Sequence, residues 1–290
     1  MAASEKDGFN PQFRPGHLLA QRYRVRTLLG LGGMSEVYDA YDEKRDHGVA
    51  LKILPRARTR SKEQVERFRR QALAALQIRH PGIVEVYDWG NDNGTYFVVM
   101  ERLVGSDLGQ RIVEGMPFSF AFVTKVAVQM ARAAHAAHRT GVIHRDLKPA
   151  NVFLVQSDDG NESVKLLDFG VAKLQADASF TYTEQIMGTP AYMAPEQLQS
   201  AKYVDARADV YAIGCIIYEM LTGRPPFTAS NKMELMLMVT NDRAEPIECL
   251  RAEVPRELIR IIEKAMAKDP AERFASAALL ANALQRLGIS

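Results

Sequence analysis

Cysteine is scarce in this sequence: its 290 residues include two, Cys215 and Cys249. Two cysteines cannot build the disulfide framework that stabilises small secreted domains. Neither lies in a CxxC pair or in a cluster with histidine, so the spacing does not support a zinc site. Cys215 lies in an apolar run, where a free cysteine is typical of the core. We therefore expect a reduced globular protein.

The sequence also lacks an excess of charge of one sign and has no long apolar run. The chain has 37 Lys and Arg against 35 Asp and Glu, which gives no reason to propose a nucleic acid or an anionic membrane as the main partner. The basic stretch 56–70 is interrupted by Glu63 and Glu66 and is typical of a solvated helix face. No uncharged apolar stretch approaches the ~18 residues of a membrane span, and the N-terminus has no apolar signal segment. We expect a cytoplasmic protein without membrane contact, on the cytoplasmic side of the membrane if a longer natural chain carries an anchor.

The hydrophobic pattern of the first hundred residues is mostly that of strands. Residues 1–17 are polar and predict a flexible N-terminal tail. Apolar residues then alternate, which predicts strands over 23–29, 37–41, 49–53 and 96–100. One helix interrupts them, with Ser61 as its N-cap and His80-Pro81 at its end.

After Gly105 the apolar spacing becomes helical. The predicted helices cover 118–140, 209–221, 232–240, 256–267 and 276–287. Strands first and helices afterwards are the pattern of an α+β protein. We expect a small sheet lobe over about residues 18–103 and a larger helical lobe over about 104–290.

A glycine-rich segment lies between two of the predicted strands. It consists of Leu29, Gly30, Leu31, Gly32, Gly33, Met34, Ser35, Glu36 and Val37. Glycine has no Cβ, so the backbone can approach a phosphate closely. A dinucleotide-binding loop would need a helix directly after it and a third glycine, but a strand pattern follows and Ser35 takes the glycine's place. Lys52, in the apolar strand 49–53, is ambiguous alone, because a lysine at a sheet edge can simply be exposed.

The loop HRDLKPAN at 144–151 concentrates polar side chains after a helix end. A loop with a purely structural role rarely needs histidine, arginine, aspartate, lysine and asparagine together. A site for phosphoryl transfer does need such groups. The Asp146 carboxylate can accept a hydroxyl proton, Lys148 can neutralise a phosphate, and the Asn151 amide oxygen can bind a metal ion. Asp168 directly follows another apolar strand, where its carboxylate can bind Mg²⁺.

With these motifs in this order, and Ala194-Pro195-Glu196 after them, the sequence resembles the protein kinase superfamily from about Tyr23 to Leu287. The segment GLGGMSEVY is similar to the glycine-rich segment of the bacterial eukaryotic-like Ser/Thr kinases. Lys148 and Thr189 match the Ser/Thr pattern and not that of tyrosine kinases. The resemblance implies a bilobal fold, with a small antiparallel sheet lobe carrying one main helix and a mainly α-helical lobe. It also implies transfer of the ATP γ-phosphoryl group to Ser or Thr of proteins, with Mg²⁺ or Mn²⁺ as the cofactor.

The resemblance implies a role for each site residue. Asp146 is the catalytic base, Lys148 stabilises the transferred phosphoryl group, and Asn151 and Asp168 hold the metal ions. The ATP site includes the whole glycine-rich segment, Lys52 at the phosphates, and a set around the adenine: Val37, Ala50, Met100 as gatekeeper, Glu101, Leu103 and Phe153. Three further residues are structural: Glu196 pairs with Arg273, and Asp209 braces the catalytic loop.

Activity and regulation depend on four other positions. Family members carry a glutamate that pairs with the strand lysine, and Gln71 stands in its place here. Thr181 and Thr183 lie where similar bacterial kinases are phosphorylated, and Arg145 can capture such a phosphate. Two functions stay open: an active Ser/Thr kinase that phosphorylates its own activation loop, and a weakly active, pseudokinase-like nucleotide-binding scaffold. A homodimer through the N-terminal lobe is a further expectation.

Overall fold

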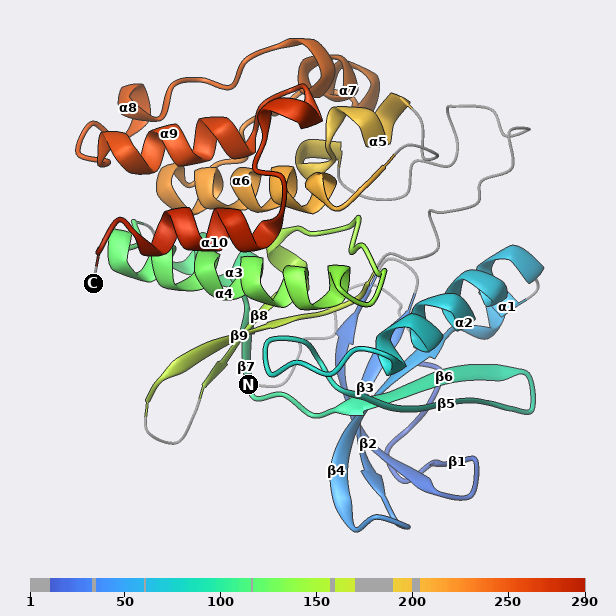
Figure 1. The fold of residues 1–290 in the computed structure, drawn as a ribbon. Coiled ribbons are helices and arrows are strands. Elements are labelled where there is room, and N and C mark those ends of the chain that lie inside the picture. Colours follow the sequence, from blue (N-terminus) through green and yellow to red (C-terminus); the bar gives the residue numbers. More distant parts are fainter. Residues whose placement is uncertain are drawn as a thin grey trace. The chain divides into compact units, whose positions relative to one another are not determined.

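The computed structural model describes residues 11–32, 35–59, 61–115, 117–156, 160–169, 190–199 and 204–289 (Figure 1). The chain forms two compact units. The first consists of Met1–Leu76 and Glu85–Leu103, and the second of Gln77–Val84 and Val104–Ser290. The sequence did not predict that the short segment Gln77–Val84 packs with the second unit.

The first unit is built on a six-stranded antiparallel sheet with the order β1-β2-β3-β4-β6-β5. The strands are β1 (Leu18–Leu19), β2 (Tyr23–Leu31), β3 (Glu36–Asp42), β4 (His47–Leu54), β5 (Val86–Asp92) and β6 (Thr95–Glu101). Two helices, α1 (Arg56–Thr59) and α2 (Lys62–Leu76), complete the unit. The four strands that the alternation predicted are confirmed, each slightly longer than expected.

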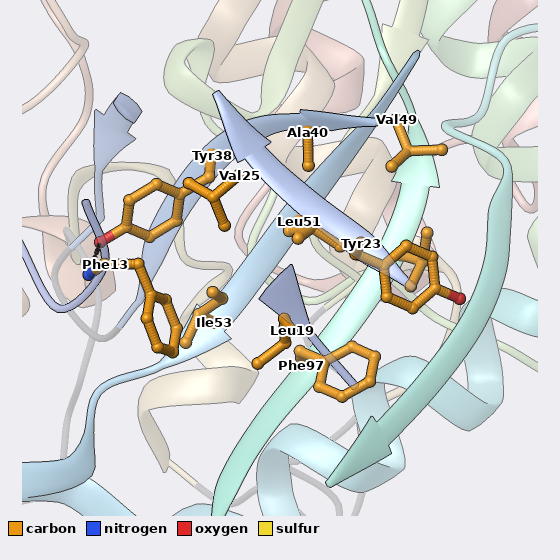
Figure 2. Close-up of a cluster of buried hydrophobic side chains, with 11 residues drawn as sticks. Phe13, Leu19, Tyr23, Val25, Tyr38, Ala40, Val49, Leu51, Ile53 and Phe97 are labelled. Atoms are coloured by element: carbon orange, nitrogen blue, oxygen red, sulfur yellow. Dashed lines mark hydrogen bonds between the residues drawn. The ribbon is translucent and has the colours of Figure 1, made fainter. Parts of the chain in front are cut away.

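One face of this sheet carries a cluster of buried hydrophobic side chains (Figure 2). Successive side chains of a strand point to opposite faces. Leu51 and Ile53 of β4 therefore point into the cluster, whereas Ala50 and Lys52 point to the other face. The second face is covered by α2, whose Phe68 packs with buried side chains of β4 and β6.

Residues 11–17 pack against the sheet, which differs from the flexible tail expected over 1–17. Phe13 is 8% exposed and belongs to the hydrophobic cluster. The Gly16 N–H donates a 2.8 Å hydrogen bond to the Val25 carbonyl, and the Val25 N–H donates one of 2.8 Å to the His17 carbonyl. Phe13 is an isolated apolar side chain in a polar segment. No periodic pattern of apolar residues therefore indicated in the sequence that it would be buried.

The predicted helix cap at Ser61 is confirmed. Ser61 Oγ accepts a 3.3 Å hydrogen bond from the Gln64 N–H, which satisfies one of the unpaired donors of the first turn.

The second unit is mainly helical. Its α-helices are α3 (Leu108–Glu114), α4 (Phe120–His138), α5 (Pro195–Gln199), α6 (Arg207–Thr222), α7 (Lys232–Asn241), α8 (Ile247–Leu250), α9 (Arg256–Ala265) and α10 (Ala277–Gln285). Short 3₁₀ turns cover Pro149–Asn151, Pro190–Tyr192 and Pro270–Glu272. A three-stranded antiparallel sheet consists of β7 (Gly105–Asp107), β8 (Val152–Gln156) and β9 (Glu162–Leu166).

Helix α6 forms the core of this unit and packs against α4, α9 and α10. It approaches α9 at Gly214, where an added Cβ would lie 2.8 Å from Met266 Cγ. The helix ends at Gly223, whose φ of 78° is the left-handed conformation that favours glycine. In the ranges that the structure describes, no helix is long and apolar enough to cross a membrane. The α+β class, with a sheet unit and a mainly helical unit, is confirmed.

Candidate phosphoryl-transfer site

The loop 144–151 brings three predicted site residues together in the second unit. Lys148 Nζ lies 3.1 Å from Asp146 Oδ2. Asn151 Nδ2 donates hydrogen bonds to the Asp146 carbonyl at 2.7 Å and to its Oδ2 at 3.3 Å. Because the amide nitrogen of Asn151 faces Asp146, its amide oxygen is turned to the opposite side. An amide oxygen and a carboxylate suit a hard cation such as Mg²⁺.

Asp209 holds the backbone of this loop from α6. Its Oδ2 accepts a 2.9 Å hydrogen bond from the His144 N–H, and its Oδ1 accepts one of 2.9 Å from the Arg145 N–H. His138 Nε2, from α4, lies 2.7 Å from the same Oδ2. Burial by itself would raise the pKa of the Asp209 carboxyl, but the hydrogen bond and charge of His138 and the loop donors hold it below its ordinary value.

His144 is fully buried and ties the loop to the segment that carries Asp168. Its Nε2 lies 2.7 Å from the Leu167 carbonyl, and its Nδ1 accepts a 3.3 Å hydrogen bond from the Asp146 N–H. Burial lowers the pKa of His144. Because Nδ1 accepts a hydrogen bond, the nitrogen that donates to the Leu167 carbonyl is Nε2. The ring also packs against Phe169, with centroids 4.6 Å apart.

Arg145 and Asp168 both have a left-handed backbone. Their φ angles are 62° and 54°, a conformation that costs energy for residues other than glycine. Asp168 is exposed, and the preceding Leu167 N–H donates a 2.9 Å hydrogen bond to the Asn151 carbonyl. The two predicted metal ligands therefore lie on segments that are directly hydrogen-bonded. Gly170, next in the chain, lies outside the described residues.

The Arg145 side chain is a buried cation. Its Nη2 donates a 3.2 Å hydrogen bond to the Val204 carbonyl. Within the described part of the chain, Nε and Nη1 are buried and have no hydrogen-bond partner. Burial lowers the pKa of the guanidinium, opposed by the charge of Asp209. Such a group favours an anionic partner.

The remaining predicted pair of the second unit, Glu196 and Arg273, forms a two-pronged ion pair. Arg273 Nη1 lies 2.7 Å from Glu196 Oε1, and Nη2 lies 2.8 Å from Oε2. The arginine side chain is 0% exposed and the glutamate side chain 15%.

Phe153, which was predicted to contact the adenine, is a half-buried residue of β8. It is paired with Asp107 of β7 and Lys165 of β9.

In the first unit, four residues predicted to surround ATP share one face of the sheet. Val37 pairs with Lys52, and Ala50 pairs with Met100. Directly paired residues of an antiparallel ladder lie on the same face, as do residues two apart on one strand. Glu101 pairs with Val49 at the end of β6, and Leu103 is the last residue of the unit.

The glycine-rich segment connects β2 to β3. Leu29, Gly30 and Leu31 are exposed at the end of β2. The Gly32 N–H donates a 2.8 Å hydrogen bond to the Ser35 carbonyl, and Ser35 and Glu36 are buried. Gly33 and Met34 lie outside the described residues, as do Thr181, Thr183 and Thr189.

Gln71 lies on the stripe of α2 that faces the sheet. Phe68, Ala72 and Ala75 are buried, and Gln71 is half-buried among them at helical spacing. Glu66 forms ion pairs within α2: its Oε1 lies 3.1 Å from Arg69 Nη1 and 2.9 Å from Arg70 Nε. An amide therefore stands at this half-buried position of α2.

Sequence reasoning missed the part that His138 plays. His138 touches Asp209, the residue that holds the backbone of the loop 144–151. No local pattern could reveal this contact, because its partner lies on another helix.

Comparisons with known proteins agree on one family. A family model described as "Protein kinase domain" matches residues 23–284. The Serine/threonine-protein kinase PknB of Mycolicibacterium smegmatis is 37% identical over 91% of this chain and 42% of its own length. PknD of Mycobacterium tuberculosis is 38% identical over 89% of this chain and 38% of its own length. The crystal structure of the M. tuberculosis PknI kinase domain matches with a TM-score of 0.75 and 29% identity, covering 94% of this chain and 99% of that one. This chain spans about 40% of the length of the curated relatives it matches.

Proposed function

From the premise that this chain belongs to the protein kinase domain family, we propose that it transfers the γ-phosphoryl group of ATP to Ser or Thr side chains of proteins. The observation that carries the proposal is the arrangement around Asp146. One loop holds a carboxylate, the ammonium of Lys148 and the amide of Asn151 within direct hydrogen-bond distance of one another. The family generally uses ATP and Mg²⁺, and its partners are ATP and protein substrates.

Each of these residues has a distinct task. Asp146 orients the substrate hydroxyl and accepts its proton as the bond to phosphorus forms. Lys148 places a positive charge beside that carboxylate, where it stabilises the transferred phosphoryl group. Asn151 and Asp168 would hold Mg²⁺, which when bound neutralises charge on the phosphate oxygens.

Lys52 and the glycine-rich segment would contact the phosphates from the first unit. Val37, Ala50 and Met100 share the face of Lys52, which supports a nucleotide site on that face. Glu101, Leu103 and Phe153 would complete the adenine site. The Ser/Thr preference rests on Lys148, Thr189 and the relatives described as serine/threonine-protein kinases.

The test is incubation of the purified chain with γ-labelled ATP, Mg²⁺ and a general protein substrate, followed by mapping of the phosphorylated residues. We expect label on Ser and Thr, and almost none with Asp146→Asn, which should still bind ATP. Label that is equal in the two proteins would contradict the assignment of Asp146. ATP binding without transfer in the unaltered chain would favour the alternative that Gln71 suggests, a nucleotide-binding scaffold.

The homodimer through the sheet unit stays a proposal. β5 ends the order of the sheet, and an edge strand has unpaired backbone groups that a second copy can contact. Light scattering over a range of protein concentrations would test it.

A further inference from the structure

The six residues from Gln12 to His17 precede the first strand, and no motif above uses them. Phe13 inserts into the hydrophobic cluster of the first unit (Figure 2). Its ring stacks on that of His17, with centroids 4.3 Å apart, and lies 6.1 Å from that of Tyr38. We refer to residues 12–17 as the N-terminal clasp, anchored by Phe13.

Gln12, at the front of the clasp, hydrogen-bonds to three separate parts of the unit. Its N–H donates to Glu36 Oε2 at 3.1 Å, and its Nε2 donates to Thr95 Oγ1 at 3.3 Å. Its Oε1 accepts a 2.9 Å hydrogen bond from the Arg56 N–H. Glu36 begins β3, Thr95 begins β6, and Arg56 follows the end of β4 at Leu54. One residue therefore connects the ends of three strands.

Glu36 is a buried carboxylate that takes one of its hydrogen bonds from the clasp. It is 5% exposed, and its Oε2 accepts hydrogen bonds from the Gln12 N–H and the Tyr38 hydroxyl. The Phe13 N–H in turn donates to that hydroxyl oxygen at 3.2 Å. Burial and the hydrogen bond to Glu36 raise the pKa of Tyr38, so its hydroxyl stays protonated and can donate. A buried carboxylate without such donors is costly.

These contacts lie beside the proposed nucleotide site. Glu36 pairs with Leu31 across the glycine-rich segment and with Ile53 on β4. The next pair along β3 and β4 is Val37 with Lys52. We infer that the clasp is a positioning device for nucleotide binding: by holding Glu36 and Arg56, it fixes the strand ends that carry the glycine-rich segment and Lys52. Its effect on ATP rests on the proposed function.

The experiment compares the full chain with Phe13→Ala, Gln12→Ala and Leu19→Ala. Leu19 is 1% exposed in the same cluster, so its variant controls for lost packing away from the glycine-rich segment. We expect the two clasp variants to raise the dissociation constant and KM for Mg·ATP about tenfold, or about 1.4 kcal/mol, with a smaller change in kcat. Leu19→Ala should lower the melting temperature with little change in ATP affinity. Phe13→Leu, which keeps an apolar anchor, should restore most of the affinity.

Hydrogen exchange gives a readout that does not depend on catalysis. Amides of residues 29–32, 35–37, 52–54 and 56 should exchange faster in Phe13→Ala and Gln12→Ala than in Leu19→Ala. If exchange is equal and ATP affinity falls no further than in Leu19→Ala, the clasp is merely structural and the inference is overturned. If the unaltered chain binds no ATP, the proposed function fails, and the exchange comparison alone decides whether the clasp holds these strand ends.

Discussion

The imidazole of His138 lies against the carboxylate of Asp209, with Nε2 2.7 Å from Oδ2 and both side chains almost fully buried. His138→Ala would leave Asp209 with fewer donors, and an under-satisfied buried acceptor costs about 1–3 kcal/mol. We expect a loss of stability of this size and a lower kcat, because the same carboxylate holds the catalytic loop, while KM for ATP changes little. Urea unfolding and steady-state kinetics measure the two effects.

His135→Ala is the matched control for that variant. It removes the neighbouring histidine of α4, which is not among the hydrogen-bond donors to Asp209 described above. His138→Gln, whose amide can donate, should recover part of the activity. Equal kinetics for His135→Ala and His138→Ala would mean that the contact with Asp209 does not support the loop.

Gln71→Glu should raise the phosphoryl-transfer rate. A carboxylate would give Lys52 a charge-assisted hydrogen bond, worth about 1.5–3 kcal/mol against about 0.5–1.5 for a neutral amide. The difference corresponds to roughly 5- to 30-fold in the population of the assembled site, and it should be clearest at low ATP. Gln77→Glu, the same change at an exposed position, should have no effect. An unchanged or lower rate for Gln71→Glu would show that Gln71 does not face Lys52 in the active state.

Phosphate on Thr181, Thr183 or both should appear after incubation with Mg·ATP. A phosphate adds about −1.5 to −2 charge, which the buried guanidinium of Arg145 can bind. We expect slower turnover in the Thr181→Ala/Thr183→Ala double variant, and no further loss when Arg145→Gln is added to it. Phosphopeptide mass spectrometry identifies the sites. Finding both threonines unphosphorylated in an active preparation would refute this prediction.

Removing one partner of the pair between Arg273 and Glu196 should strongly destabilise the second unit. Breaking a buried ion pair leaves an uncompensated charge and costs about 3–5 kcal/mol. We expect Arg273→Ala to lower the free energy of unfolding by about this amount, measured with urea. The exposed pair of Arg224 and Glu245 is the control, and Arg224→Ala should cost no more than about 1 kcal/mol. Similar costs for both variants would mean that burial does not set the strength of the first pair.

Short-range patterns in the sequence predicted part of the secondary structure and the residues of the candidate site. Alternation of apolar residues predicted four strands of the sheet, and Ser61 predicted the start of α2, because these signals act over a few neighbouring residues. The loop at 144–151 also holds its functional groups close together in sequence. The sequence therefore already indicated that Asp146, Lys148 and Asn151 lie close to one another.

Contacts between distant segments depend on how the elements pack. Asp209 meets His138 and His144 only because α6 packs beside α4 and the catalytic loop. The left-handed backbone of Arg145 has no local signal, since it is imposed by the hydrogen bonds and packing around the loop. Phe13 is one apolar residue among polar ones, so only the hydrophobic cluster that receives it could show that residues 12–17 are not a tail.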